Sequence, residues 1–430
     1  ASIFASNIGS EHLIGLAGAG ASSGMAMAHW EIQGWMILIL GWVFVPFYTR
    51  SMVYTMPEFL ERRYNPQSRT ILSVISLVSY VLTKVAVTVY AGGLVFQQVF
   101  GIKELWGIDF FWIAAIGLVV LTALYTIFGG MKSVLYTSVL QTPILLLGSL
   151  IILVLGFKEL GGWDEMMRVC GAVTVNDYGD TMTNLIRSND DANFPWLGAL
   201  IGSAIIGFWY WCTDQFIVQR VLSGKNEMEA RRGTIFGAYL KLLPVFLFLI
   251  PGMIAFALHQ KYIGAGGEGF LPMLENGTAN ADAAFPTLVA KLLPAGVKGL
   301  VVCGILAALM SSLASLFNSS AMLFTIDFYK RFRPQTSEKK LVGIGQVATV
   351  VIVILGILWI PIMRSVGDVL YTYLQDVQSV LAPGIAAAFL LGICWKRTSA
   401  QGGMWGLISG MVIGLSLIHI SEPTRPISIS

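Results

Sequence analysis

Residues 1–18, ASIFASNIGSEHLIGLAG, form an apolar run that polar residues and glycines interrupt. Asn7, Glu11 and His12 lie within six positions of one another, flanked by Gly9 and Gly15. In a segment that crosses a membrane, such side chains are costly unless they face a cavity or a partner. Glycines beside them favour unwound backbone, which membrane proteins tolerate where it lines a cavity. A polar helix end at the membrane surface is the alternative, and the spacing favours the cavity.

The composition of the whole chain indicates a membrane protein. Of its 430 residues, 56% are hydrophobic and 12% are charged, and the mean hydropathy is +0.73. Soluble domains carry about 25% charged residues. The net charge of +3 gives no indication of nucleic-acid binding. The four cysteines lack metal or redox spacing, so neither a disulfide framework nor a metal cluster is expected.

Apolar runs long enough to cross a bilayer recur along the sequence. Hydropathy predicts eleven spans, at residues 1–29, 33–50, 69–99, 107–129, 132–157, 196–219, 234–259, 295–329, 341–363, 366–395 and 403–419. The connecting segments alternate in charge, with sixteen lysines and arginines in one set and about eight in the other. The positive-inside rule places the richer set in the cytoplasm. We therefore predict a multi-pass protein of the plasma (inner) membrane.

The spans are predicted to form one transporter domain, residues 1–418. Because the chain opens within an apolar run, we interpret it as a fragment truncated at both ends. The last residues, 419–430, are rich in serine and proline and are interpreted as a non-native tail.

A serine pair in the eighth span is a candidate cation site. Ala308 precedes Ser311 and Ser312 by three and four residues, so a carbonyl and two hydroxyls converge on one helix face. Neutral oxygens of this kind suit Na⁺. Packing of small residues between helices is the alternative, and on the residues alone it is favoured.

Other polar and aromatic residues inside spans suggest a site for a neutral polyhydroxylated solute. The aromatic run 208–211 lies more than ten residues into its span, too deep for an interfacial belt. Lys241 either snorkels to the cytoplasmic surface or reaches a cavity. Glu31 begins the second span and Gln375 the tenth.

Several ordered motifs resemble the sodium:solute symporter family, and most closely its sodium/glucose cotransporter branch. Besides residues 1–18, the motifs are TMPEFLERRY (55–64), ALYTIFGGMKSVLYT (123–137), WYWCTDQFIVQR (209–220), GAYLKLLPVFLFLIPGM (237–253), AALMSSLASLFNSSAMLFTIDFY (307–329) and LAPGIAAAFLLGICWKR (381–397). The resemblance implies an all-α membrane protein with the leucine-transporter fold. In that fold two inverted five-helix repeats form the core, here within residues 1–157 and 196–395, and one extra helix follows.

The resemblance also implies the residues of the sites. The expected Na⁺ ligands are the carbonyls of Ala5, Ile8 and Ala308 and the hydroxyls of Ser311 and Ser312. The expected sugar contacts are Asn7, His12, Glu31, Lys241 and Gln375, with Tyr210 stacking on the ring as inner gate and Trp211 beside it. The expected outer lid is Leu16, Trp30 and Tyr371.

The implied function is Na⁺-coupled symport of a glucose- or galactose-like sugar by alternating access. Ser138 occupies a position where many members carry an aspartate linked to a second cation, so we predict one Na⁺ per sugar. Coupling to myo-inositol or another polyol is an alternative, and so is a sugar-gated cation channel or sensor. An enzyme is not expected, because no catalytic constellation is apparent. The sequence gives no oligomeric state.

Overall fold

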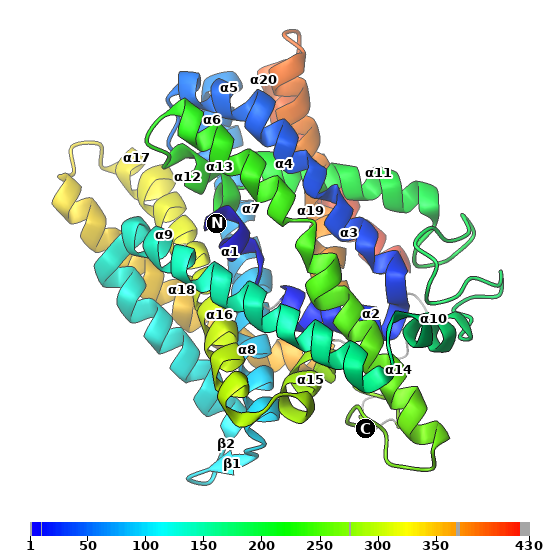
Figure 1. Ribbon diagram of the computed structural model, residues 1–430. Coiled ribbons are helices and arrows are strands. Elements are labelled where there is room, and N and C mark those ends of the chain that lie inside the picture. Colours follow the sequence, from blue (N-terminus) through cyan, green and yellow to red (C-terminus); the bar gives the residue numbers. More distant parts are fainter. Residues whose placement is uncertain (1, 10, 275–276, 367–369, 422–430) are drawn as a thin grey trace.

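The computed structural model describes residues 2–9, 11–274, 277–366 and 370–421, with only the backbone described for residues 2, 130–133, 140, 362–376 and 417–421. These residues form a bundle of helices, viewed in Figure 1. The first half contains α1 (Ser2–Asn7), η1 (Glu11–Leu16), α2 (Ala17–Ser23), η2 (Gly24–Met27), α3 (Ala28–Ile32), η3 (Gln33–Trp35), α4 (Met36–Ile39), η4 (Leu40–Phe44), α5 (Val45–Ser51), α6 (Met56–Arg63), α7 (Pro66–Ser79), η5 (Tyr80–Val85), α8 (Ala86–Phe100), the hairpin β1 (Glu104–Leu105) and β2 (Ile108–Asp109), and α9 (Phe110–Leu160).

The second half begins with the short helix α10 and a long loop, which lead to the remaining helices. Its elements are α10 (Trp163–Gly171), α11 (Trp196–Gly207), η6 (Phe208–Thr213), α12 (Gln215–Leu222), α13 (Glu227–Leu240), η7 (Val245–Leu249), α14 (Ile250–Gly264), η8 (Ala281–Ala283), α15 (Ala284–Leu292), α16 (Ala295–Met322), η9 (Leu323–Tyr329), α17 (Lys330–Phe332), α18 (Glu338–Val366), α19 (Leu370–Cys394) and α20 (Ala400–Ser421). Many η elements continue a neighbouring helix, so α7, η5 and α8 together form one long rod.

The helices reproduce most of the predicted spans. Within the described residues, nine helices are long and apolar enough to cross a membrane. The first two predicted spans merge into a single helical run, Glu11–Ser51, because short 3-10 turns join them without a loop. The predicted spans 107–129 and 132–157 are confirmed as two separate spans, Phe110–Gly129 and Val134–Leu160, although a single helix, α9, covers both. Figure 1 draws α9 as two successive rods that meet at an angle. The predicted eleventh span coincides with α20.

Each half begins with an interrupted helix. In the first half the α-helix ends at Asn7 and helix resumes at Glu11. In the second half the backbone of Asp214 becomes extended, and α12 starts at the next residue. The Asp214 carboxylate caps α12 by accepting from the Phe216 backbone N–H at 3.1 Å, which stabilises the first turn of that helix. The interruption predicted in the first span is therefore confirmed, and a second one lies in the sixth.

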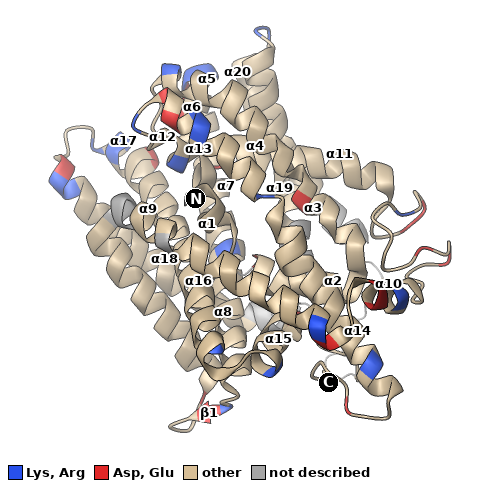
Figure 2. Ribbon diagram, viewed as in Figure 1, with Lys and Arg blue, Asp and Glu red and all other residues tan. Residues whose placement is uncertain are grey.

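The long helix α16 lies beside both interruptions. It packs against α9, α1 and α12, so it brings the predicted serine pair close to the first helix. In Figure 2 the lysines and arginines gather at the end of the bundle that contains α5, α6, α13 and α17. This is the end that the positive-inside rule assigns to the cytoplasm.

Candidate functional site

The serine pair of α16 lies against the interruption in the first helix. The Ser312 hydroxyl donates to the Ser6 carbonyl at 3.0 Å, and a Cβ on Gly9 would overlap that hydroxyl. Only a glycine therefore permits this approach. Buried beside them are Ala5, Ile8 and Ala308, whose carbonyls were expected to bind Na⁺. The arrangement brings neutral hydroxyl and carbonyl oxygens together without a carboxylate, which is the donor chemistry that Na⁺ accepts.

Ser138, the residue expected to be aspartate in many family members, lies at the same place. Its hydroxyl is buried and lies 3.0 Å from that of Ser311. A residue at position 138 therefore does contact the serine pair, although here it supplies no charge. The prediction of a single coupled Na⁺ depends on this missing charge and stays a prediction.

Lys241 is the centre of the predicted solute site. Its ammonium group donates to Asn7 Oδ1 at 2.6 Å and lies 2.7 Å from Glu31 Oε2. The same ammonium is 2.8 Å from His12 Nε2. All four side chains are buried, each with no more than 5% of its surface exposed. Lys241 therefore reaches a cavity and does not snorkel to the cytoplasmic surface, which resolves the two interpretations of the sequence.

His12 and Glu31 complete this polar cluster. His12 Nε2 is 3.2 Å from Glu31 Oε1, while the buried Nδ1 of the same ring has no partner among the described residues. A buried nitrogen without a partner is uncommon and calls for an explanation. A hydroxyl-bearing ligand would provide that partner.

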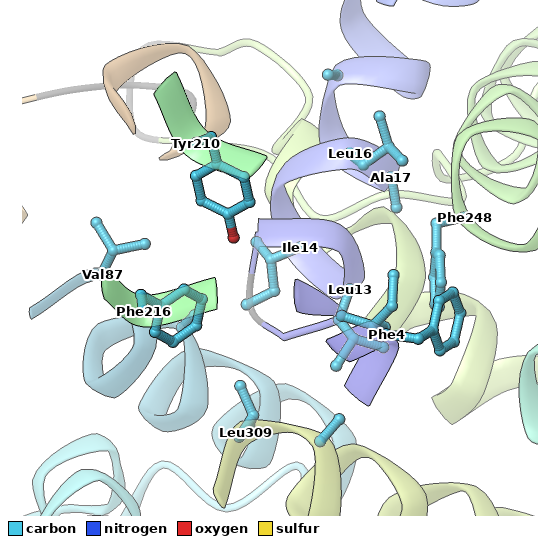
Figure 3. Close-up of a cluster of buried hydrophobic side chains, with 14 of the residues drawn as sticks. Phe4, Leu13, Ile14, Leu16, Ala17, Val87, Tyr210, Phe216, Phe248 and Leu309 are labelled. Carbon is cyan, nitrogen blue, oxygen red and sulfur yellow. The ribbon is translucent and has the colours of Figure 1, made fainter. Parts of the chain in front are cut away.

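Two aromatic rings form the wall beside the polar cluster. The Asn7 amide donates to the Tyr210 hydroxyl at 2.9 Å, and the Tyr210 and Trp211 rings meet edge to face with centroids 4.9 Å apart. Figure 3 shows the Tyr210 hydroxyl directed towards the first helix near Ile14. The ring is therefore held at the site by the same asparagine that contacts Lys241.

A second buried ion pair supports the Tyr210 ring from behind. The Lys84 ammonium lies 2.7 Å from Asp214 Oδ2 and 4.5 Å from the Tyr210 ring centroid. The Tyr80 hydroxyl donates to the same carboxylate. Asp214 ends the interrupted helix that carries Tyr210, so this pair fixes both the end of η6 and the face of the ring. Lys84 lies deep within the predicted span 69–99, and the sequence does not indicate its partner.

A small cavity of about 20 Å³ lies among these groups. It is lined by Asn7, Glu11, His12, Trp30, Glu31, Gln33, Tyr210, Trp211, Lys241 and Gln378. A volume of this size holds about one water molecule, so the side chains must separate before a hexose can enter. Gly34 permits the present close packing, because a Cβ there would lie 2.5 Å from Lys241 Cγ.

Three lining residues had no predicted role in the solute site or in the outer lid. Gln33 lies two positions after Glu31, and its buried Oε1 has no partner among the described residues. Gln378 lies one helical turn beyond the predicted Gln375, on the same face of α19. Glu11 interrupts the apolar run in the sequence but was given no role. In each case the usable signal was a polar side chain within a span.

The predicted outer lid is only partly described. Trp30 lines the cavity, whereas Leu16 is fully buried but is not among the lining residues. The side chains of Tyr371 and Gln375 lie outside the described residues, so their predicted roles stay predictions.

A larger cavity, of about 850 Å³, opens at the end of the bundle assigned to the cytoplasm. Its lining includes Tyr48, Gln219, Lys225 and Asn318. It shares no lining residue with the small cavity. The Tyr48 hydroxyl donates to the Cys212 carbonyl at 2.7 Å, so the helix that carries Tyr210 lies between the two spaces.

Comparison with known proteins gives the family. A model of the sodium:solute symporter family matches residues 1–410. The chain belongs to this family. Among family relatives, the human (Homo sapiens) sodium/myo-inositol cotransporter 2 is 39% identical over 428 residues, covering 96% of this chain and 62% of the relative. Sodium/glucose cotransporter 1 of sheep (Ovis aries) is 41% identical over 445 residues, covering 97% and 64%. The chain thus spans somewhat less than two thirds of the length of these relatives.

Solved structures agree on the fold. A Na⁺-coupled sialic acid symporter in a substrate-bound outward-open state superposes with a TM-score of 0.74 at 21% identity, covering 97% of this chain and 88% of that one. MhsT in complex with L-phenylalanine gives 0.58 at 13% identity, covering 97% and 96%. The chain is a multi-pass membrane protein with the leucine-transporter fold, as predicted.

Proposed function

We propose that this chain is the core of a symporter that uses Na⁺ to carry a neutral, polyhydroxylated six-membered ring across the plasma membrane into the cell. The observation that carries the proposal is the position of two adjacent residues in the interrupted first helix. The Ser6 carbonyl contacts Ser312 at the candidate Na⁺ site, and Asn7 contacts Lys241 and Tyr210 at the candidate solute site.

This adjacency couples the two sites through a few ångströms of unwound backbone. An ion that binds the carbonyls of the interrupted helix restricts their conformations, and the same restriction positions the Asn7 amide for a solute. Binding of a solute then requires less additional ordering of the backbone and of Asn7. This gives positive cooperativity between ion and solute. The proposed ligands of the single ion are the carbonyls of Ala5, Ile8 and Ala308 and the hydroxyls of Ser311 and Ser312.

The chemistry of the solute site supports a sugar or a cyclitol. An aromatic wall stacks against C–H faces, while amide, imidazole, ammonium and carboxylate groups bind hydroxyls. Named relatives transport both classes by their names, glucose in one case and myo-inositol in the other. We propose glucose- or galactose-like sugars as the first candidate. Myo-inositol is the second candidate, because it is also a neutral ring of the same size.

Alternating access requires a path to the cytoplasm that opens after the ion and the solute have bound. The 850 Å³ cavity supplies that path in part, and Tyr210 with η6 separates it from the solute site. Tyr210 is therefore proposed as the inner gate. Movement of its ring would break one hydrogen bond, to Asn7, and one contact with the Lys84 ammonium.

The available free energy is sufficient for accumulation. One charge that moves through 100 mV contributes about 2.3 kcal/mol, and a tenfold Na⁺ gradient adds about 1.4 kcal/mol. Together they sustain a solute gradient of roughly several hundred-fold at one Na⁺ per solute.

Uptake of radiolabelled glucose, galactose and myo-inositol into proteoliposomes tests the proposal. An inward Na⁺ gradient should drive transient accumulation above the external concentration, and an equal choline gradient should not. Tyr210→Ala and Ser312→Ala should each abolish accumulation. A sugar-dependent Na⁺ current without accumulation would identify a sugar-gated channel instead, and full uptake by both variants would refute the site assignment.

A further inference from the structure

Two carboxylates line the small cavity, and their surroundings differ. Glu31 is buried and pairs with Lys241 at 2.7 Å and with His12 at 3.2 Å. Glu11 is the first residue of η1 and is only partly buried, because it faces the cavity. Its carboxylate makes no hydrogen bond or ion pair with any described residue. Glu11 is therefore a carboxyl group that faces the cavity and that the described residues leave without a partner.

The neighbouring cations do not compensate this charge. Lys84 and Lys241 are the cations whose charges act on Glu11. Each is already paired, Lys84 with Asp214 at 2.7 Å and Lys241 with Glu31 at 2.7 Å. When Glu11 is ionised and His12 is neutral, the cavity and the pairs behind it carry one negative charge in excess. In a space of low dielectric constant, such a charge acts strongly on any ligand that enters.

We propose that Glu11 determines which solutes are accepted according to their charge. This inference rests on the proposed function, because it assumes that a sugar occupies the cavity. Glu11 accepts a hydrogen bond from a hydroxyl of a neutral sugar, and it binds an ammonium group in that place more strongly through charge. It repels a carboxylate, which would be buried next to a like charge without a cation of its own.

The substrate class that follows is neutral and cationic sugars. Among rings of one shape, a protonated amino sugar is bound most tightly, a neutral hexose is bound less tightly, and a uronic acid is excluded. Glu31 does not produce this order, because the charges of Lys241 and Glu31 cancel.

A series of sugars that differ at one position tests the proposal. Glucose, 6-amino-6-deoxyglucose and glucuronate carry a hydroxyl, an ammonium and a carboxylate on the same carbon. Each is used to compete with labelled hexose for Na⁺-driven uptake at pH 7. For the unmodified chain, the amino sugar should inhibit at lower concentration than glucose, and glucuronate should inhibit at least tenfold more weakly than glucose.

Glu11→Gln should change the order of preference among the three sugars. The ratio between the inhibitory concentrations of glucuronate and the amino sugar should fall at least tenfold, whatever the accompanying change for glucose. Glu11→Asp, which keeps the charge, should preserve the original order. An unchanged ratio in Glu11→Gln would overturn the proposal, and so would equal inhibition by all three sugars in the unmodified chain.

Binding measured without transport separates this proposal from the proposed function. Trp30 and Trp211 line the cavity, so quenching of tryptophan fluorescence in detergent reports binding of the three sugars directly. If uptake never depends on Na⁺ but the order of binding still follows charge and still requires Glu11, the proposed function fails and this inference stands. If Glu11→Gln does not fold, equal affinities of the unmodified chain for the three sugars would still refute the inference.

Discussion

Replacing Lys241 by methionine should separate the structural role of the polar cluster from its role in solute binding. Methionine keeps most of the aliphatic stem but removes the ammonium that contacts Asn7, His12 and Glu31 at 2.6–2.8 Å. Glu31 then remains a buried carboxylate without its cation. Breaking a buried pair on one side costs about 3–5 kcal/mol, so Lys241→Met should lower the free energy of unfolding by about that amount.

The double variant gives the sharper result. Glu31→Gln alone leaves the Lys241 ammonium unpaired and should cost a similar amount. Lys241→Met with Glu31→Gln removes both charges, so its cost should be less than the sum by about 2–3 kcal/mol, at the upper end of coupling energies between contacting residues. Stability should partly return while uptake does not, because the donors to the solute are still missing.

Thermal unfolding in detergent and Na⁺-driven uptake should be measured for all three variants. Lys339→Met, at an exposed position in the first turn of α18, is the matched control and should leave both unchanged. Additive losses of stability in the double variant would show that the two charges do not interact, and recovery of uptake would show that they do not bind solute.

Three further results are expected. Ser312→Ala should abolish Na⁺-driven uptake, because it removes a hydroxyl ligand of the ion, whereas Ser320→Ala, also buried on the same helix, should leave uptake unchanged. Equal effects of the two variants would contradict the ion site. Tyr210→Phe keeps the ring but loses the hydrogen bond from Asn7, which is worth about 0.5–1.5 kcal/mol. The sugar concentration for half-maximal uptake should therefore rise only roughly 2–12-fold, whereas Tyr210→Ala should abolish uptake. Loss of uptake in both variants would contradict a stacking role. In the outer loop, burial raises the pKa of Asp191, but hydrogen bonds from the Asn176 amide and two backbone N–H groups outweigh it and hold that pKa below its usual 3.8. A carboxyl group with a lowered pKa stabilises the fold above pH 3.8, and this stabilisation is lost as the pH falls through the pKa of the folded state. Hydrogen exchange in residues 172–195 should therefore accelerate in that acidic range. Exchange that is independent of pH, after correction for the intrinsic rate, would contradict this prediction.

The sequence predicted the membrane spans well because lipid imposes a simple rule. Apolar length decides whether a helix crosses a bilayer, and that signal survives in almost every element. It was least accurate at residues 24–36, where two predicted spans form one helical run, Glu11–Ser51. There short 3-10 turns join the helices without a loop, so hydropathy could not show that the helix continues.

The residues of the buried polar cluster could be predicted from the sequence, but their pairings could not. Polar side chains within spans identified Asn7, Glu31 and Lys241, since lipid excludes such groups unless they face each other. Which carboxylate pairs with which lysine depends on how distant helices pack, and no spacing rule connects Lys84 to a partner 130 positions away at Asp214. The same limit explains why Glu11 had no predicted role.

The family resemblance and the residues alone led to different interpretations of the serine pair. Helix packing was favoured for Ser311 and Ser312, because small residues in a span usually serve that purpose. The contact of Ser312 with the Ser6 carbonyl across the interrupted helix could not be found from either segment separately.

The central claim is that ion and solute cross together, and a reversed driving force tests it most directly. Proteoliposomes with equal Na⁺ on both sides and no membrane potential should take up tracer ²²Na⁺ when an inward sugar gradient is imposed. Net Na⁺ entry should match sugar entry one for one, and it should disappear in Ser312→Ala. Sugar entry with no accompanying Na⁺ would contradict symport, and a ratio of two would contradict the single site inferred from Ser138.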